Sequence, residues 1–156
     1  MPTSRDPNDD VNEPQPGQHP LADHIGYMLR RAQLSVFQDF CQSTEVFGLR
    51  PAEYSVLVVL EESPGTRMNH LAKLLGIKPA NCAILINKLV QMDLVRRERL
   101  AEDSRVINLF LTPVGEILLH GVNKKVTEHR DRLRERLGPG GAEQLLDLLA
   151  RLIEEN

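Results

Sequence analysis

Two short apolar-periodic segments, joined at Gly76, constrain the fold of this 156-residue chain more than any other feature. Residues 68–89 place apolar side chains at the spacing of two helices that each bury one face, namely Leu71, Leu75, Ile77, Cys82 and Leu85. Ala72 supplies a small contact at which two helices can cross steeply, and Gly76 supplies a turn residue that tolerates positive φ. The pattern favours a tight pair of crossed helices, with an ordinary helical hairpin as the alternative.

The surrounding residues predict a mainly α (α+β) fold with a single hairpin. Apolar residues at three- and four-residue steps predict helices over residues 21–45, 51–62, 66–75, 79–92, 113–137 and 142–153, with Thr66 as a candidate N-cap. Alternation with a period of two predicts strands over 94–99 and 106–111, joined by a polar tip. Because a lone two-stranded hairpin is marginally stable, it must pack on the helices that precede it.

The N-terminal residues differ from the rest in composition. Residues 1–20 are rich in Pro, Asp, Asn and Gln and carry almost no apolar side chains. Such a segment cannot offset the entropy lost on ordering, so we predict a disordered tail over 1–20 and a folded domain over 21–156. The tail lacks the apolar core of a secretory signal, and no run of about 18 apolar residues is present to span a membrane.

Charge is unevenly distributed along the chain, although the formal net charge is only -3. Residues 66–105 carry eight basic and four acidic side chains, whereas residues 1–20, 21–65 and 106–156 each have an acidic excess. A basic segment between acidic flanks indicates a polyanion-binding surface, and a solvated mixed-charge surface is the alternative. The weakly acidic total therefore does not exclude a nucleic-acid partner.

Residues 93–115 carry the most specific motifs. Leu94-Val95 begins the hairpin, Asp103-Ser104-Arg105 forms its tip, and Leu111-Thr112-Pro113-Val114-Gly115 joins it to the next helix. Together with the helix–turn–helix spacing and the helix order, these motifs resemble the MarR family of winged helix-turn-helix transcriptional regulators. The resemblance covers residues 21–156. It implies a bacterial DNA-binding regulator whose second short helix enters the major groove.

The hairpin, or wing, would supply the basic contacts to DNA. The resemblance implies that Arg105 reaches into the minor groove, where negative potential is focused, and that Asp103 holds its guanidinium. Ser104 completes the tip. On the preceding strand, Arg97 matches a basic position of the family, and Arg96 and Arg99 add charge that suits phosphates. The alternative for Asp103 and Arg105 is a surface ion pair of little energetic value.

The expected recognition helix departs from the usual family pattern. Many members carry a basic residue and Ser or Thr near its start, and an Arg where this chain has Ile84. Helical geometry places Ala80, Asn81, Ile84, Asn87, Lys88 and Gln91 on or near its exposed side, and Lys78 directly precedes it. The candidate DNA-binding residues of this segment are Lys78, Ala80, Asn81, Ile84, Asn87 and Lys88. Asn81 could pair with an adenine edge, Ala80 or Ile84 could contact thymine methyls, and both lysines suit phosphates. This predicts A·T-rich half-sites, although Ile84 could instead be a packing residue.

The long terminal helices carry broad apolar stripes. By the resemblance, helices over about 21–47 and 113–155 dimerise the chain, and a DNA-binding lobe occupies about 49–112. Four residues are the candidates for the homodimer interface: Leu145, Leu149, Leu152 and Ile153. Some of them could instead cover the core of their own protomer. Two-fold symmetry would then set half-sites about one DNA turn apart, in a pseudo-palindromic operator.

A small-molecule effector is also implied by the resemblance, bound between the dimerisation helices and the DNA-binding lobe. The candidate residues are aromatic and basic side chains of the first two helices: His24, Tyr27, Arg30, Arg31, Phe37 and Tyr54. An aromatic wall beside an arginine suits an aromatic carboxylate or its coenzyme A thioester. Core packing remains the alternative for most of these aromatic residues. We expect a repressor of neighbouring genes, although repression or activation depends on where the operator lies.

Other functional classes are disfavoured. Cys41 and Cys82 are too few for a disulfide scaffold or a zinc site and are expected to be buried, inert thiols in a reducing cytoplasm. The five histidines show no close metal-binding spacing, so neither a metal sensor nor a cofactor is expected. No nucleophile elbow, phosphate loop or dinucleotide motif supports an enzyme. The remaining alternative is a winged-helix protein-interaction module without specific DNA binding.

Overall fold

The computed structural model describes residues 20–99 and 106–154. These residues divide into two compact units, one ending at Phe37 and the other beginning at Gln38. Helix α1 (Ile25–Thr44) contains the boundary between the units. It begins four residues later than the periodicity predicts, because residues 21–23 form a turn in which the His24 amide donates to the Leu21 carbonyl at 3.0 Å. The predicted tail over 1–20 lies almost entirely outside the described residues.

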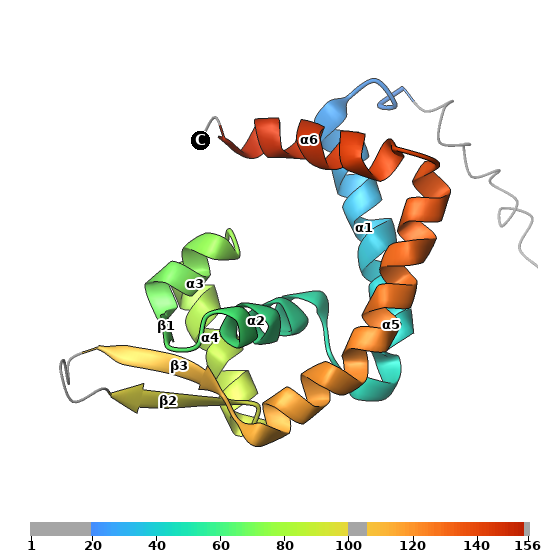
Figure 1. Cartoon of the computed structure of the whole chain (residues 1–156). Helices are drawn as coiled ribbons and strands as arrows, with labels where there is room; N and C mark the ends of the chain where they lie inside the picture. Colours follow the sequence, from blue (N-terminus) through green and yellow to red (C-terminus); the bar gives the residue numbers. More distant parts are fainter. Residues whose placement is uncertain (1–19, 100–105, 155–156) are drawn as a thin grey trace, which may run out of the picture. The chain divides into compact units, whose positions relative to one another are not determined.

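The second unit confirms the mainly α fold with a small sheet (Figure 1). After α1 come a 3-10 turn (Glu45–Phe47), α2 (Pro51–Glu62), β1 (Thr66–Arg67), α3 (Met68–Leu74), α4 (Pro79–Gln91), β2 (Val95–Arg99), β3 (Ile107–Leu111), α5 (Pro113–Leu137) and α6 (Gly141–Glu154). Proline opens α2, α4 and α5, where its missing N–H is not needed. No helix among the described residues is long and apolar enough to cross a membrane.

The sheet has three strands in the order β1-β3-β2, so the expectation of a two-stranded hairpin was incomplete. Thr66 pairs with Leu109, and Val95 pairs with Leu111, both antiparallel. Thr66 is therefore a strand residue rather than the predicted N-cap, and its hydroxyl donates to the Ser63 carbonyl at 2.7 Å. A strand of two residues is too short to show alternation, and only its pairing with β3 defines it.

A single core joins α2, α3, α4, β3 and α5. Its fully buried side chains include Leu57 and Leu60 of α2, Leu71 of α3, Ile86 and Leu89 of α4, Leu109 of β3, and Leu119 and Val122 of α5. Leu71 and Cys82 are buried as predicted, whereas Leu75, Ile77 and Leu85 are only half-buried against this core. Gly76 has a φ of +63°, which confirms the turn between α3 and α4.

Backbone contacts around Asp93 and Thr112 fix the base of the wing. Helix α4 ends at Gln91, and Asp93, two residues later, has a φ of +57°. The Leu94 amide donates to the Leu89 carbonyl at 2.9 Å. The Thr112 hydroxyl donates to the Asp93 carbonyl at 2.5 Å and accepts from the Gly115 amide at 3.0 Å. Thr112 thus caps α5 and ties its start to the end of α4. The wing is thereby held at its base to the helix that precedes it.

Candidate nucleic-acid interface

Helix α4 presents one polar face to solvent. Cys82, Ile86 and Leu89 are buried against the core. All six predicted DNA-contact positions on or next to the helix are exposed: Lys78, Ala80, Asn81, Ile84, Asn87 and Lys88. Ile84 is 68% exposed, so within the described residues it does not pack in the core. A large apolar side chain in an otherwise polar exposed face is available for contact with another molecule.

The arginines of β2 lie on two faces of the sheet. Successive side chains of a strand point to opposite faces, so Arg96 and Arg97 diverge. An Arg97 terminal amino group donates to the Asn87 amide oxygen at 2.6 Å, which places Arg97 beside α4. The Arg96 guanidinium instead lies 4.8 Å from the centre of the Phe110 ring and pairs with Glu98. Of the two, only Arg97 shares a surface with the exposed face of α4.

The rest of the predicted wing is only partly described. Arg99 is exposed at the end of β2. The tip residues Asp103, Ser104 and Arg105 lie outside the described residues. Their predicted contacts with the minor groove and with each other stay predictions.

A buried carboxylate behind α4 was missed by the sequence analysis. Glu53, in the first turn of α2, is only 3% exposed. One of its oxygens accepts from the Arg50 amide at 2.9 Å, and the other pairs with the Lys88 ammonium group. Glu at the third position after Arg50, in a helix opened by Pro51, is a capping signal that could have indicated its role at the helix start. Nothing in the local sequence indicates the partner 35 residues away.

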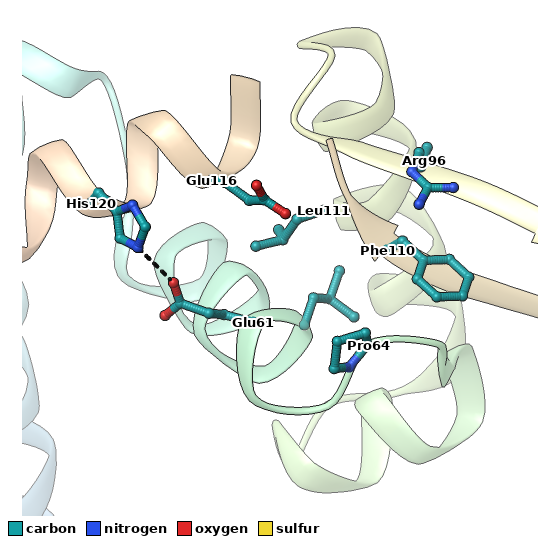
Figure 2. Close-up of a pocket in the computed structure, with 8 residues that line it drawn as sticks. Glu61, Pro64, Arg96, Phe110, Leu111, Glu116 and His120 are labelled. Atoms are coloured by element: carbon teal, nitrogen blue, oxygen red, sulfur yellow. Dashed lines mark ion pairs between the residues drawn. The ribbon is translucent and has the colours of Figure 1, made fainter. Parts of the chain in front are cut away.

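A shallow pocket of about 300 Å³ lies on the Arg96 side of the wing (Figure 2). Its lining comes from the end of α2 and the turn after it, from β2 and β3, and from the first part of α5: Leu60, Glu61, Pro64, Arg96, Phe110, Leu111, Glu116 and His120. His120 Nε2 lies 3.2 Å from a Glu61 carboxylate oxygen and links α5 to α2. None of the lining residues belongs to the predicted effector site. Among the described residues, no group of three His, Cys, Asp or Glu could hold a metal.

Comparisons with known proteins agree with this geometry. Residues 47–106 match the family model described as MarR family. A protein of Thauera aromatica, named as a regulator of the hcr operon, is 27% identical over 137 residues, which are 87% of this chain and 82% of the relative. The structure of the transcriptional repressor CouR bound to a 23-mer DNA duplex is 37% identical, covers 90% of this chain and 99% of that one, and has a TM-score of 0.82. The chain belongs to the MarR family.

A second CouR structure, bound to p-coumaroyl-CoA, is 36% identical with a TM-score of 0.80 and covers 87% of this chain and 96% of that chain. MarR-family proteins are DNA-binding transcriptional regulators and not enzymes, so membership confirms the expected class of function. The exposed face of α4 and the adjacent Arg97 are the parts of this MarR-family chain suited to a DNA backbone and groove.

The predicted effector residues of this MarR-family chain fall in both compact units. His24, Arg30 and Arg31 are exposed and Tyr27 is half-buried, all in the first unit with Phe37. The Arg31 guanidinium donates to the Tyr27 hydroxyl at 3.1 Å and lies 5.9 Å from the centre of its ring. Tyr54 belongs to the second unit. A site shared by these six residues stays a prediction.

Tyr54 lies within a polar and aromatic network of the second unit. Its hydroxyl donates to the Asn123 amide oxygen of α5 at 3.2 Å, and its ring lies 5.6 Å from that of Phe40. Burial, followed by the charges of Arg130 and Glu61 acting in opposite directions, raises the pKa of Tyr54 above its usual value. The hydroxyl therefore stays protonated near neutral pH and is a hydrogen-bond donor.

The two cysteines differ in exposure. Cys82 is buried in α4, and burial raises the pKa of its thiol, which suppresses the reactive thiolate. Cys41 is half-buried near the end of α1, so the expectation that both thiols are buried was correct only for Cys82. The exposure of a side chain on a helix changes from one residue to the next. Periodicity alone therefore does not determine whether Cys41 lies on the buried or the exposed side of α1.

Proposed function

We propose that this chain is a homodimeric transcriptional repressor that binds a pseudo-palindromic operator near the genes it controls. One observation supports the proposal above all: the exposed polar face of α4, which includes Asn81 and Asn87, lies beside the wing arginine Arg97. A winged-helix domain binds DNA with a helix that fits the major groove and with a positively charged wing strand. The similar structure of the repressor CouR, which is bound to a 23-mer DNA duplex, supports DNA binding by this chain.

The contacts within each half-site follow from residue chemistry. Asn81 is suited to an adenine edge, Ala80 and Ile84 to thymine methyls, and Lys78 to a phosphate. Arg105, which follows Asp103 and Ser104 in the sequence and lies outside the described residues, has the side chain suited to a narrow minor groove. Arg97 and Arg99 add charge along the wing, and Arg96 lies farther from α4. These contacts favour A·T-rich half-sites.

Selection from a pool of random duplexes tests this proposal. The wild-type chain is expected to enrich paired half-sites about one helical turn apart. Its affinity for them is expected to fall steeply with salt, because phosphate contacts release counterions. Half-sites with G·C pairs under Asn81 would contradict the A·T assignment. Absent or salt-independent DNA binding would instead favour a protein-interaction module.

We propose further that α6 contributes to the dimer interface. Leu145, Leu152 and Ile153 are exposed in the single chain, and Leu149 is half-buried. A row of exposed leucines on one helix is an unusual solvent-facing surface and suits a second copy of the same helix. The helices over about 21–47 and 113–155 would form the dimerisation part, and residues of about 49–112 the DNA-binding lobe.

The effector in this proposal is an aromatic carboxylate or its coenzyme A thioester. Support comes from the stacked pair Tyr27 and Arg31 and from the CouR structure bound to p-coumaroyl-CoA. Arginine pairs with a carboxylate or phosphate, and aromatic rings bind a flat apolar body. The remaining candidates are His24, Arg30, Phe37 and Tyr54.

Titration of a protein–DNA complex tests the effector assignment. Coumarate, benzoate and p-coumaroyl-CoA would each be added to a labelled duplex bound by the wild-type chain, with free coenzyme A as the control. At least one aromatic compound is expected to release the DNA, and substitution of Arg31 by Met is expected to weaken that release. Unchanged DNA affinity with both the acids and the thioester would contradict the assignment.

A further inference from the structure

Glu53 occupies an unusual position for a charged side chain. It is almost fully buried behind the recognition helix α4, at the start of α2. A buried carboxylate needs hydrogen bonds and an opposite charge, because it has lost its contact with water. Glu53 obtains a hydrogen bond from the Arg50 amide at 2.9 Å and a charge from the Lys88 ammonium group.

Lys88 has half of its side chain exposed, but its charged end is not free. Its ammonium group contacts the buried oxygen of Glu53, whose side chain is 4% exposed. Movement of Lys88 to a phosphate would leave Glu53 with the Arg50 amide as its remaining partner among the described residues. A buried charge that loses its partner is strongly unfavourable, so the pair resists separation. Lys78 differs, because its ammonium group forms no ion pair with any residue that the structure describes.

Asn87, the residue before Lys88, anchors the same turn of α4 on another side. Its amide oxygen accepts from Arg97 of β2 at 2.6 Å. A guanidinium only donates hydrogen bonds, so this contact fixes the amide with its oxygen toward the wing. Consecutive residues thus connect α4 to α2 and to β2. The last turns of α4 are held by polar contacts, whereas Asn81 and Ile84 in its first half are exposed to solvent.

We propose that Glu53 and Lys88 are positioning residues of the recognition helix, and that Lys88 does not neutralise a DNA phosphate. The inference rests on the DNA-binding function proposed above. The ion pair sets the angle at which the first half of α4 presents its side chains to the bases. Its loss should lower the discrimination between the operator and other DNA, while the number of phosphate contacts stays the same.

The test compares Lys88→Met and Glu53→Gln with Lys78→Met as the matched control. Affinity is measured at several salt concentrations for a duplex selected by the wild-type chain and for a duplex of scrambled sequence. Lys78→Met is expected to lower the slope of log affinity against log salt by about 0.9 for each lost phosphate contact. Lys88→Met is expected to leave the slope unchanged and to reduce the ratio of specific to non-specific affinity by about fivefold or more.

Glu53→Gln is expected to reduce the ratio of specific to non-specific affinity without weakening the binding of scrambled DNA. The substitution releases the Lys88 charge and keeps the oxygen that caps α2. Lys88→Arg, which keeps a positive charge next to Glu53, should keep the wild-type slope and retain the selectivity that Lys88→Met loses. If Lys88→Met does not fold, as judged by circular dichroism, the Glu53→Gln and Lys88→Arg variants still decide the outcome. A wild-type-like selectivity of Glu53→Gln would overturn the proposal.

A drop in the slope of Lys88→Met equal to that of Lys78→Met would likewise overturn it, since Lys88 would then be a phosphate contact. Failure of the DNA-binding function itself has a different signature. In that case the wild-type chain would bind neither duplex in a salt-dependent way, which would overturn the DNA-binding function and with it the positioning role of Glu53 and Lys88.

Discussion

Gly115 lets helix α5 begin directly against the backbone of the wing. A Cβ atom at this position would lie 2.2 Å from the Leu94 carbonyl oxygen. That oxygen also accepts from the Thr112 amide at 3.1 Å, so it cannot move without breaking a contact at the base of the wing. Glycine is required at position 115 because the Leu94 backbone lies too close to leave space for a Cβ atom.

Substitution of Gly115 by Ala is expected to destabilise the fold by about 1–3 kcal/mol, as overpacking does in a tight core. Urea unfolding followed by circular dichroism measures the change. Gly26→Ala is the control, because a Cβ added there has no described atom within 4 Å apart from its chain neighbours and the adjacent backbone of its own helix. Equal free energies of unfolding for Gly115→Ala and the wild type would contradict this reason for the glycine.

Cys41 and Cys82 should be distinguishable by their reaction with a thiol reagent. Native protein is expected to react with Ellman's reagent at the half-buried Cys41 and only slowly at Cys82, whose thiol is buried and has a raised pKa. Unfolding in guanidinium should expose both. Cys41→Ser is the control, since it should remove the fast phase. A fast phase that persists in Cys41→Ser would show that Cys82 is accessible in the folded chain.

At the scale of elements, a polar cluster ties the end of α1 to α5. Asp39 accepts from Arg132 at 2.9 Å and lies 2.9 Å from Nδ1 of His129, which is 4% exposed. Arg132 also donates to the Ser43 hydroxyl at 2.6 Å. Partial burial raises the pKa of Asp39, but the hydrogen bonds from Arg132 and His129 outweigh it and lower the pKa below its usual value. All four residues lie in the second compact unit.

A depressed pKa in the folded state makes this contribution depend on pH. The ionised carboxylate stabilises the fold above the pKa that Asp39 has in the unfolded chain, about 3.9, and the stabilisation is lost as the pH falls through the lower folded value. Asp39→Asn is therefore expected to cost about 1–2 kcal/mol at pH 7 and progressively less below about pH 4. Thermal unfolding at pH 7, 5 and 3 measures the difference.

Asp131→Asn, on the exposed side of α5, is the control and should show little effect at any pH. A difference in thermal stability between Asp39→Asn and the wild type that stays constant from pH 7 to pH 3 would indicate that the carboxylate charge does not stabilise the fold.

At the scale of the whole molecule, the single chain leaves much apolar surface on α6 uncovered. Ile153 is 74% exposed and Leu152 is 52% exposed. If a second copy covers this surface, as proposed, a pair of charges there should separate the protomers. Apolar side chains lose their stabilisation when they remain in water, so dimerisation is the simplest way to bury these residues.

The double variant Leu152→Glu/Ile153→Glu is expected to shift sedimentation equilibrium from dimer to monomer and to weaken binding to a two-half-site duplex at least tenfold. Val46→Glu is the matched control, because Val46 is 93% exposed and lies outside α6. A double variant that remains dimeric would place the interface elsewhere on the chain.

Much of the fold could be predicted because the residues that begin and end each helix act locally in the sequence. The prolines at 51, 79 and 113, the break at 138–141 and the left-handed Gly76 mark the ends of helices within a few residues. The exposed face of α4 was predicted for the same reason, since burial of Cys82 and Leu89 fixes the opposite side of a regular helix. Strand β1 could not be predicted, because two residues carry no period.

The sequence alone determined the order of the helices and of the two wing strands, because periodicity, proline and glycine act within a few residues of the backbone. Only the tertiary structure decided that Glu53 is buried against Lys88, and that Arg97 lies beside Asn87 while Arg96 turns to Phe110. These contacts join elements that are separate in sequence. Their geometry depends on how helices and strands pack, and the pattern within one element does not encode its partner.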